Sequence, residues 1–458
     1  MPITSVHPAY KANLERWTRC RDSYEGSDAI KSAGETYLPK LSGQDAIAYG
    51  AYVKRALYYG AVGRSIDGFV GAIVRKPPGI KLPTKMGIFE KDTTASGIGL
   101  TEFIKKLSCE DLLAGRVGIL IDFDETASRA YLAAYSAESI TNWGENFIVL
   151  KEAAFVQDAT DRFAQKEIEQ YRELTLDDGM YKVRIWRKKE TAQPGSDEWG
   201  ISEEIVPTKQ GIALKEIPFI WLSCFGQSDK IEKPPLLALI DVALSHYRSS
   251  ADLEHGRHFT ALPTLYVTGV SDTTSPIHVG AQTAILLSDS AAQVGYAEFS
   301  GQGLGSLERA LEEKEHMMAV LGGAVFADQR KGVEAAETAR IRSSGETSLL
   351  MGVVNSVEEA LESSLRKAAE WMNVALSGED AIDIAINRDF IDVTLDPQTL
   401  TALLKSYLSG AISLETFLFS IEKAQMMSPD RSIEQEIAAI KAQPVPGAEG
   451  DPKDQNII

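Results

Sequence analysis

The chain has 458 residues, and 65 acidic against 47 basic side chains give it a net charge of −18. This length suggests two or three packed units, and 44% hydrophobic with 24% charged residues excludes wholesale disorder and fibrous structure. The acidic balance argues against a general nucleic-acid binder, because neutralising phosphates needs an excess of Lys and Arg on the contacting face.

The three cysteines, Cys20, Cys109 and Cys224, lie far apart and form neither a disulfide framework nor a zinc-ribbon spacing. That usage is typical of a chain made in a reducing compartment. The N-terminal residues lack the basic and apolar regions of a signal peptide, and no apolar run approaches the ~18 residues that span a bilayer. We therefore expect a soluble protein made in the cytoplasm, without a membrane partner.

The first 115 residues predict helices separated by an exposed connection over residues 81–99. Tyr10, Leu14, Trp17 and Tyr24 fall on one face of the first helix. The later helices are expected over residues 44–59, 62–73 and 100–114, and Pro77-Pro78-Gly79 ends the third helix of the chain.

Residues 117–123 predict a short buried strand, and from about residue 146 to 222 the hydrophobic period changes to two, which favours antiparallel strands. Asp177-Asp178-Gly179 is a turn signal that closes residues 181–188 onto 168–176 as a hairpin. Beyond Pro234-Pro235, a helix is expected over residues 236–262, where Pro263 follows.

A small β unit is predicted over residues 263–305, between that helix and a second one over 306–321 that Ser306 would cap. A long amphipathic helix follows over residues 337–373. Its inward face carries seven apolar residues: Leu350, Val354, Val357, Leu361, Leu365, Ala368 and Met372. Its other face carries five charged residues: Glu358, Glu359, Glu362, Arg366 and Lys367. Two more helices are expected within 400–441, and the composition after residue 443 predicts a disordered tail.

Familiar catalytic motifs are absent from the sequence. No Gly-Lys dipeptide occurs, so there is no Walker A loop, and there is no G-x-S-x-G or H-E-x-x-H motif. The spacing of Gly301, Gly303 and Gly305 differs from a dinucleotide fingerprint and favours a flexible loop. We therefore expect no catalytic residue, no cofactor and no enzyme activity.

Two clusters nevertheless contain metal-ligating residue types. His246, Asp252, Glu254, His255 and His258 lie within thirteen residues, and His255 and His258 would share one helical face as zinc or nickel ligands. Asp122 and Asp124 end a strand on one side, where paired carboxylates would suit Mg²⁺. A solvated helix face and a strand-end turn explain the same residues, so we predict no metal site.

Eight motifs, in order along the chain, resemble the portal proteins of tailed bacteriophages, with the nearest likeness to a podovirus-type, portal-like family. They are Tyr37-Leu-Pro-Lys-Leu, Tyr52-Val-Lys-Arg-Ala-Leu-Tyr-Tyr, Phe69-Val-Gly-Ala-Ile-Val-Arg-Lys-Pro-Pro, Leu113-Ala-Gly-Arg-Val-Gly-Ile-Leu-Ile-Asp, Ile217-Pro-Phe-Ile-Trp, His246-Tyr-Arg-Ser-Ser-Ala-Asp-Leu, Leu262-Pro-Thr-Leu-Tyr-Val-Thr-Gly and Ala336-Glu-Thr-Ala-Arg. The likeness covers most of residues 10–375, and its specificity comes from the order of the motifs.

The resemblance implies an α+β, portal-like fold, mostly helical, with an antiparallel β region and a small α/β clip inserted between two stem helices. The implied parts are an N-terminal wing (1–235), stem helices (236–262 and 306–323), the clip (263–305), a tunnel loop (324–336), a long wing helix (337–376), a C-terminal helical wing or short crown (377–443) and the disordered tail (444–458).

The resemblance further implies a structural virion protein: a homododecameric head-to-tail connector at the unique capsid vertex. Double-stranded DNA would be packaged and ejected through its channel, and its implied partners are the terminase large subunit, head-completion, adaptor and tail proteins, and the major capsid and scaffolding proteins. In the implied tunnel loop, Gln329, Arg330 and Lys331 are the candidates for DNA contact. Glu312, Glu313 and Glu315 are candidates for lining the channel or meeting a neighbouring subunit. The alternatives are a non-channel head-assembly adaptor or scaffold-type protein, and a metal-dependent enzyme.

Overall fold

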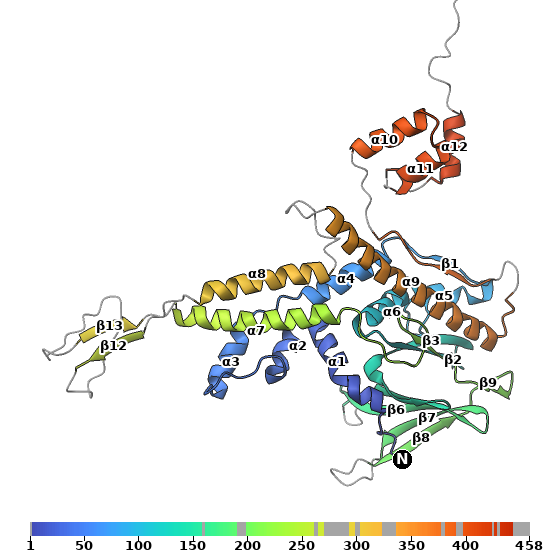
Figure 1. Cartoon of the computed structure of the whole chain (residues 1–458). Helices are drawn as coiled ribbons and strands as arrows, with labels where there is room; N and C mark the ends of the chain where they lie inside the picture. The colour runs from blue at the N-terminus through green and yellow to red at the C-terminus, as the bar shows by residue number, and fades with distance from the viewer. Residues whose placement is uncertain are drawn as a thin grey trace, which may run out of the picture. The chain divides into compact units, whose positions relative to one another are not determined.

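The computed structural model describes residues 2–157, 161–189, 198–260, 264–269, 293–297, 303–322, 336–376, 381–390, 397–423, 426–427 and 431–442. The chain divides into two units, Met1–Arg388 and Asp389–Ile458. Figure 1 shows the course of the chain by element and colour. No helix in the described ranges is long and apolar enough to cross a membrane.

The N-terminal part of the first unit is helical, as predicted. Its main helices are α1 (Pro8–Glu25), α2 (Ser27–Ser32), α3 (Ala46–Arg55), α4 (Ala61–Ile73) and α6 (Leu100–Ala114). In α4, three residues that the sequence predicts to point inward, Val62, Ile66 and Ile73, are buried. The sequence left Phe69 or Val70 open as the fourth, and Phe69 is the buried one. On the predicted face of α1, Tyr10 and Trp17 are buried, whereas Leu14 is 36% exposed.

The predicted helix over 44–59 ends early, because its last residues form tertiary contacts instead. α3 stops at Arg55, and Ala56 already has extended backbone angles. The Tyr58 side chain is buried, with its hydroxyl donating to the carbonyl of Ser23 at 2.8 Å, and the Leu57 amide donates to Ser250 Oγ at 3.2 Å. Tertiary contacts therefore override the helical preference of this stretch. The short helix α5 (Ile88–Lys91) lies within the predicted exposed connection, where Phe89 is buried, so the expected exposure is wrong there. β1 (Gly79–Lys81) overlaps this connection only at Lys81.

Two antiparallel sheets follow and confirm the α+β class. One has the order β11-β2-β3, and the other β4-β5-β6-β7-β8. Their strands are β2 (Val117–Asp124), β3 (Arg129–Ser136), β4 (Ile140–Gly144), β5 (Phe147–Gln157), β6 (Gln165–Asp177), β7 (Met180–Lys188), β8 (Trp199–Ile205) and β11 (Phe219–Leu222). The predicted hairpin is confirmed as β6–β7, and Asp178 and Gly179 both take positive φ in its turn. Trp17, Leu120, Leu150, Leu174 and Phe219 belong to one core cluster, which joins α1 to both sheets.

The second half of this unit contains three long helices. They are α7 (Leu237–Thr260), α8 (Leu304–Leu321) and α9 (Ala336–Trp371), close to the predicted bounds. α8 begins two residues earlier than expected, so Ser306 lies inside it, donating to the carbonyl of Gly303 rather than capping. Within the predicted β unit, the described strands β12 (Thr264–Thr268) and β13 (Gln293–Ala297) pair antiparallel.

The long helix α9 confirms most of its predicted inward face, but its charged face needs a correction. Glu358 is only 8% exposed, because β14 (Asp383–Ala385) and the residues after it pack against it. Its carboxylate accepts the Ile386 amide and pairs with Arg388, both at 2.6 Å, while Glu362 accepts the Ile384 amide at 3.3 Å. β14 also pairs with β1. Two carboxylates thus fix the last strand of the first unit onto α9.

The second unit contains three described helices, where two were predicted. They are α10 (Pro397–Leu408), α11 (Leu414–Lys423) and α12 (Ile433–Ala442). Tyr407 and Phe417 stack with ring centroids 5.2 Å apart, which joins α10 to α11. The predicted disordered tail lies outside the described residues.

Candidate functional site

The candidate site is the hairpin formed by α7 and α8, the pair that the sequence assigns to the stem. The helices lie side by side in Figure 1, and their contacts show that they run antiparallel. Residues late in α7 meet residues early in α8, as in the 2.8 Å ion pair of Arg257 with Glu308. Residues early in α7 meet residues late in α8, as in the 3.3 Å contact of His246 with Glu315. The chain between the two helices, residues 261–303, is thereby inserted at one end of a helical hairpin.

Apolar packing fixes α7 from more than one side. α8 buries Leu311 and Met318, seven residues apart, against it. α7 also buries Ile240, Tyr247 and Ala251, and it packs against α1, α3 and α4 as well as α8. α8 has only those two buried residues, so most of its surface is available to solvent or to a partner.

Lys314 is the one cation of α8 that points into the hairpin among the described side chains. Its ammonium donates to Ser249 Oγ at 2.5 Å and to the carbonyl of Ser245 at 3.3 Å. Burial, with Arg248 nearby, lowers the pKa of Lys314 below its usual value. Hydrogen bonds rather than a carboxylate therefore hold this charge between the helices.

His246 belongs to the hairpin interface and not to a solvated face. Its side chain is 2% exposed, and its Nε2 lies 3.3 Å from Glu315 Oε1. Burial lowers the pKa of His246, and this effect exceeds the opposing effect of Glu315. The neutral imidazole is therefore the favoured form, bridging α7 to α8.

The three predicted glutamates of α8 do not act together. Glu312 and Glu313 are exposed, whereas Glu315 is partly buried against His246. Because 44% of the Glu315 side chain is still exposed, all three glutamates stay predictions for facing a channel or a neighbouring subunit. The predicted tunnel-loop residues Gln329, Arg330 and Lys331 lie outside the described residues.

The remaining members of the histidine cluster have structural partners. Asp252 accepts the hydroxyl of Tyr52 at 2.6 Å, and Glu254 pairs with Arg257 at 2.9 Å. The ring of His255 meets Tyr52 edge-on at 5.3 Å. Across the described part of the chain, no three His, Cys, Asp or Glu side chains are grouped to hold a metal ion.

Asp122 and Asp124 bind different partners and do not form a paired carboxylate site. The Asp122 carboxylate lies 3.3 Å from Arg172 Nη1 and accepts the hydroxyl of Tyr131 at 3.0 Å. Asp124 instead accepts the amide of Thr126 at 2.8 Å in the turn after β2. One carboxylate thus joins the two sheets, and the other stabilises a turn.

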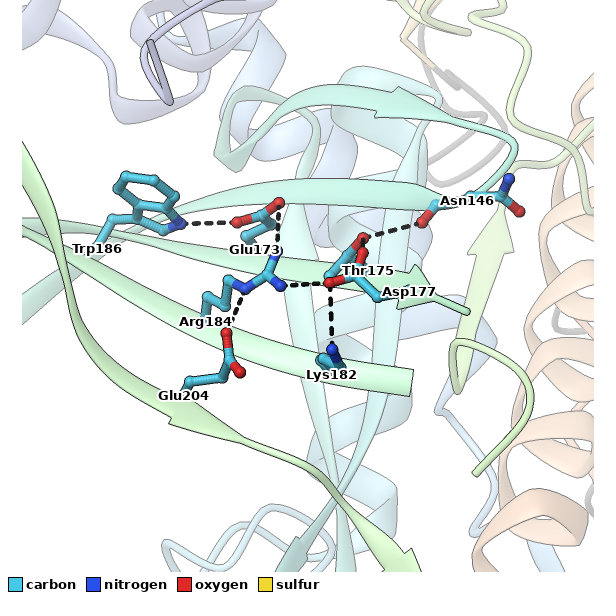
Figure 2. Close-up of polar contacts among 8 residues, drawn as sticks. All are labelled: Asn146, Glu173, Thr175, Asp177, Lys182, Arg184, Trp186 and Glu204. Atoms are coloured by element: carbon cyan, nitrogen blue, oxygen red, sulfur yellow. Dashed lines mark hydrogen bonds and ion pairs between the residues drawn. The ribbon is translucent and has the colours of Figure 1, made fainter. Parts of the chain in front are cut away.

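Sequence reasoning missed two arginine-centred networks in the sheets. In Figure 2, Arg184 on β7 reaches three carboxylates: Asp177, Glu173 at 3.6 Å and Glu204 at 2.6 Å. Arg172 on β6 joins Asp122 to Glu152, whose carboxylate lies 2.8 Å from Arg172 Nε. The alternation of apolar and polar residues predicted that these arginines lie on strands. Their carboxylate partners lie up to 50 residues away in the sequence, and no spacing rule identifies such partners.

Comparisons with known proteins gave one family match. A model described as "Domain of unknown function (DUF4055)" matches residues 235–372, which contain α7, α8 and α9. No curated protein matches the chain.

Solved structures give weak matches. A chain titled "Neck of empty GTA particle computed with C6 symmetry" matches with a TM-score of 0.40 and 13% identity, covering 85% of this chain and 96% of that one. A chain titled "Virion of native gene transfer agent (GTA) particle" matches with a TM-score of 0.38 and 13% identity, covering 83% and 93%. Likenesses at this level carry no argument about fold or function.

Proposed function

We propose that this chain is a portal protein of a tailed phage or phage-like particle. About twelve copies would form a ring at one capsid vertex, through which double-stranded DNA is packaged and ejected. The observation that carries the proposal is the order of elements over residues 236–373: an antiparallel helical hairpin, a β-containing insertion at its end, and a long helix after it. That order is the one that the sequence resemblance implies for stem, clip and long wing helix.

In this proposal the α7–α8 hairpin passes through the capsid opening. The segment between the helices docks the packaging terminase, and later the head-completion and tail proteins. The N-terminal helices and the two sheets form the wing, and residues 324–336 form the loop that approaches DNA. The chain acts as a conduit and performs no catalysis of its own.

The charge distribution suits a channel through which DNA slides. Each contact between a basic side chain and a phosphate adds salt-dependent affinity, which would retard a moving duplex. The net charge of −18 and the exposed Glu312 and Glu313 keep such contacts few. Arg330 and Lys331 would centre the duplex, with Gln329 as a neutral donor to phosphate.

The native mass of the purified protein tests the proposal, together with negative-stain images of the same sample. We expect a species near 600 kDa, twelve times the 49.9 kDa chain, and rings with a central hole. The ring is expected to form either alone or on co-expression with the capsid and scaffolding proteins of the same particle.

A chain that stays monomeric under both conditions would contradict the portal proposal. Incorporation into particles without rings would favour an adaptor or scaffold-type protein. Stoichiometric bound metal in the purified protein, measured by elemental analysis, would instead favour a metal-dependent enzyme.

A further inference from the structure

The connection from β11 to α7, residues 223–236, is held at three points by the corner between α6 and β2. The Oδ1 atom of Asp111 accepts the amide of Cys224 at 2.9 Å. Arg116 Nη1 donates to the carbonyl oxygens of Asp229 at 2.5 Å and Lys230 at 3.3 Å. Gly115 lies beside the end of the connection, where a Cβ would be in ordinary contact with the carbonyl oxygen of Lys233 at 3.4 Å, and its φ of +67° favours glycine.

Two tryptophans hold the guanidinium of Arg116 in a fixed plane. Its central carbon lies 4.3 Å from the ring centroid of Trp143 on β4 and 4.1 Å from that of Trp221 on β11. His7 stacks on Trp143 with centroids 4.0 Å apart. The two rings meet each other at 64° with centroids 6.1 Å apart, so the guanidinium lies in the corner that they form. Contact with both rings orients it, so its donors point in a set direction.

The setting of Arg116 differs from that of an ordinary buried ion pair. The residue is 1% exposed, yet it forms no ion pair with a described residue. Its Nε and Nη2 atoms are buried and donate no hydrogen bond in the described part of the chain. Burial lowers the pKa of Arg116 to about 10, and this effect exceeds the opposing effect of the nearby Asp229 carboxylate. A buried cation that no close ion pair compensates is unfavourable for stability, so the main contribution of Arg116 is the geometry that it imposes.

We propose that Arg116 is a positioning residue: held against Trp143 and Trp221, it fixes residues 223–236 and thereby the direction in which α7 leaves the sheets. The first turn of α7 follows at once, with the Leu237 amide donating to the carbonyl of Pro234 at 3.2 Å. This inference does not depend on the portal proposal. Any partner that binds the α7–α8 hairpin would be coupled to the sheets through this connection.

Hydrogen–deuterium exchange of the full chain tests the inference with Arg116→Met. Methionine keeps an unbranched apolar stem up to the position of Nε, but it lacks the guanidinium and donates no hydrogen bond. We expect amides of residues 224–236 to exchange about tenfold faster or more, while β2, β6 and β7 keep their protection. Arg184→Met is the matched control, because Arg184 belongs to the same pair of sheets and does not contact the connection. It should leave residues 224–236 unchanged.

A second variant separates charge from geometry. Arg116→Lys keeps the positive charge but lacks the planar group that stacks and reaches two carbonyl oxygens, so it should loosen the same amides. Unchanged protection of residues 224–236 in either folded variant would overturn the inference. If neither variant folds, the same exchange measurement on the wild-type protein tests the inference. Amides of residues 224–231 that exchange at the rate of an unstructured peptide would show that the connection is not fixed, and would overturn the inference.

Discussion

Asp111 is a carboxylic acid enclosed in the core at the end of α6. Its side chain is 0% exposed, and its Oδ2 atom has no hydrogen-bond donor in the described part of the chain. Burial raises the pKa of Asp111 to about 7, against the partial compensation of the hydrogen bond from Cys224. In the unfolded chain the same group has a pKa near 3.8. The folded protein therefore holds a proton that the unfolded chain releases between these two values.

This difference sets the sign of a pH dependence. Between about pH 4 and pH 7 the folded state binds more protons at Asp111, so its contribution to stability falls as pH rises and is constant above pH 7. Asp111→Asn removes the ionisation and keeps an oxygen that accepts the Cys224 amide. We expect the unfolding free energy of the variant, relative to wild type, to rise by on the order of a few kcal/mol from pH 4.5 to pH 8. Denaturant melts across this range measure it, and a pH-independent difference would contradict the assignment.

The proposed contacts with DNA depend on two neighbouring side chains, Arg330 and Lys331. Replacing both Arg330 and Lys331 with Ala should leave ring assembly intact and impair packaging or DNA retention. The matched control is the same dipeptide at Arg366 and Lys367 on α9, which pairs with Glu362 and Glu216. Nuclease-protected DNA per particle is the measurement. Equal DNA content in the Arg330/Lys331 variant and wild type would contradict the tunnel-loop role.

At the scale of elements, the two ends of the α7–α8 hairpin differ in how well they can accommodate a larger side chain in place of glycine. A Cβ on Gly322, at the end of α8, would lie 2.8 Å from the carbonyl oxygen of Met318 and 2.3 Å from Ser65 Oγ. A Cβ on Gly256 would meet only the flexible end of Leu304, at 2.7 Å. Backbone cannot move as a side-chain tip can, so the two glycines should respond differently to Ala.

We expect Gly322→Ala to lower the unfolding free energy by about 1–3 kcal/mol, as overpacking typically does. Gly256→Ala is the paired comparison and should be near neutral, because the gain in helix propensity offsets the shift of Leu304. Thermal melts of both variants measure the difference. Two equal effects would show that the close approach at Gly322 does not matter.

Periodicity predicted elements well where one face of a helix or strand is buried. The four-residue and three-residue steps of α4 identified its buried face, and the alternation over β6 and β7 with the Asp178-Gly179 turn identified their hairpin. Periodicity wrongly predicted that Glu358 lies on an exposed face, because the strand that covers this residue follows some 25 residues later in the chain. A pattern within one element carries no information about a distant segment that packs on it.

At the scale of the whole molecule, β14 completes the first unit although it lies near that unit's end. A chain ending at Arg388 retains β14, Glu358 with its backbone donor, and the hydrogen bond of Asn387 to the carbonyl of Ala72 at 2.8 Å. A chain ending at Leu376 lacks all of these partners. The buried carboxylate of Glu358 would then be left without the Ile386 amide and Arg388.

We therefore expect the 1–388 chain to unfold cooperatively, with the melting temperature of the first unit in the full-length protein. The 1–376 chain should be less stable by about 3 kcal/mol or more, because an unpaired buried charge remains. Calorimetry of the three chains is the measurement. Similar melting of the two truncated chains would show that β14 is dispensable.

The sequence supported the succession of helices and sheets across the molecule, but it did not identify the contacts that join them. Arg172 and Asp122 lie on different sheets, and Tyr52 on α3 binds Asp252 on α7, 200 residues later. Single charges and hydroxyls leave no periodic signal, so these partners emerge only once the elements are packed. The portal role likewise rests on the order of motifs and elements and not on a local constellation.

The near contact of Gly256 with Leu304 has a practical consequence. The chain leaves the hairpin after Thr260 and returns at Leu304, and this contact holds the departure and return points close together. A short flexible linker could therefore replace the intervening residues without stretching either helix. We therefore expect residues 261–303 to be exchangeable: insertions or substitutions from related chains would alter what this segment binds while α7 and α8 keep their packing.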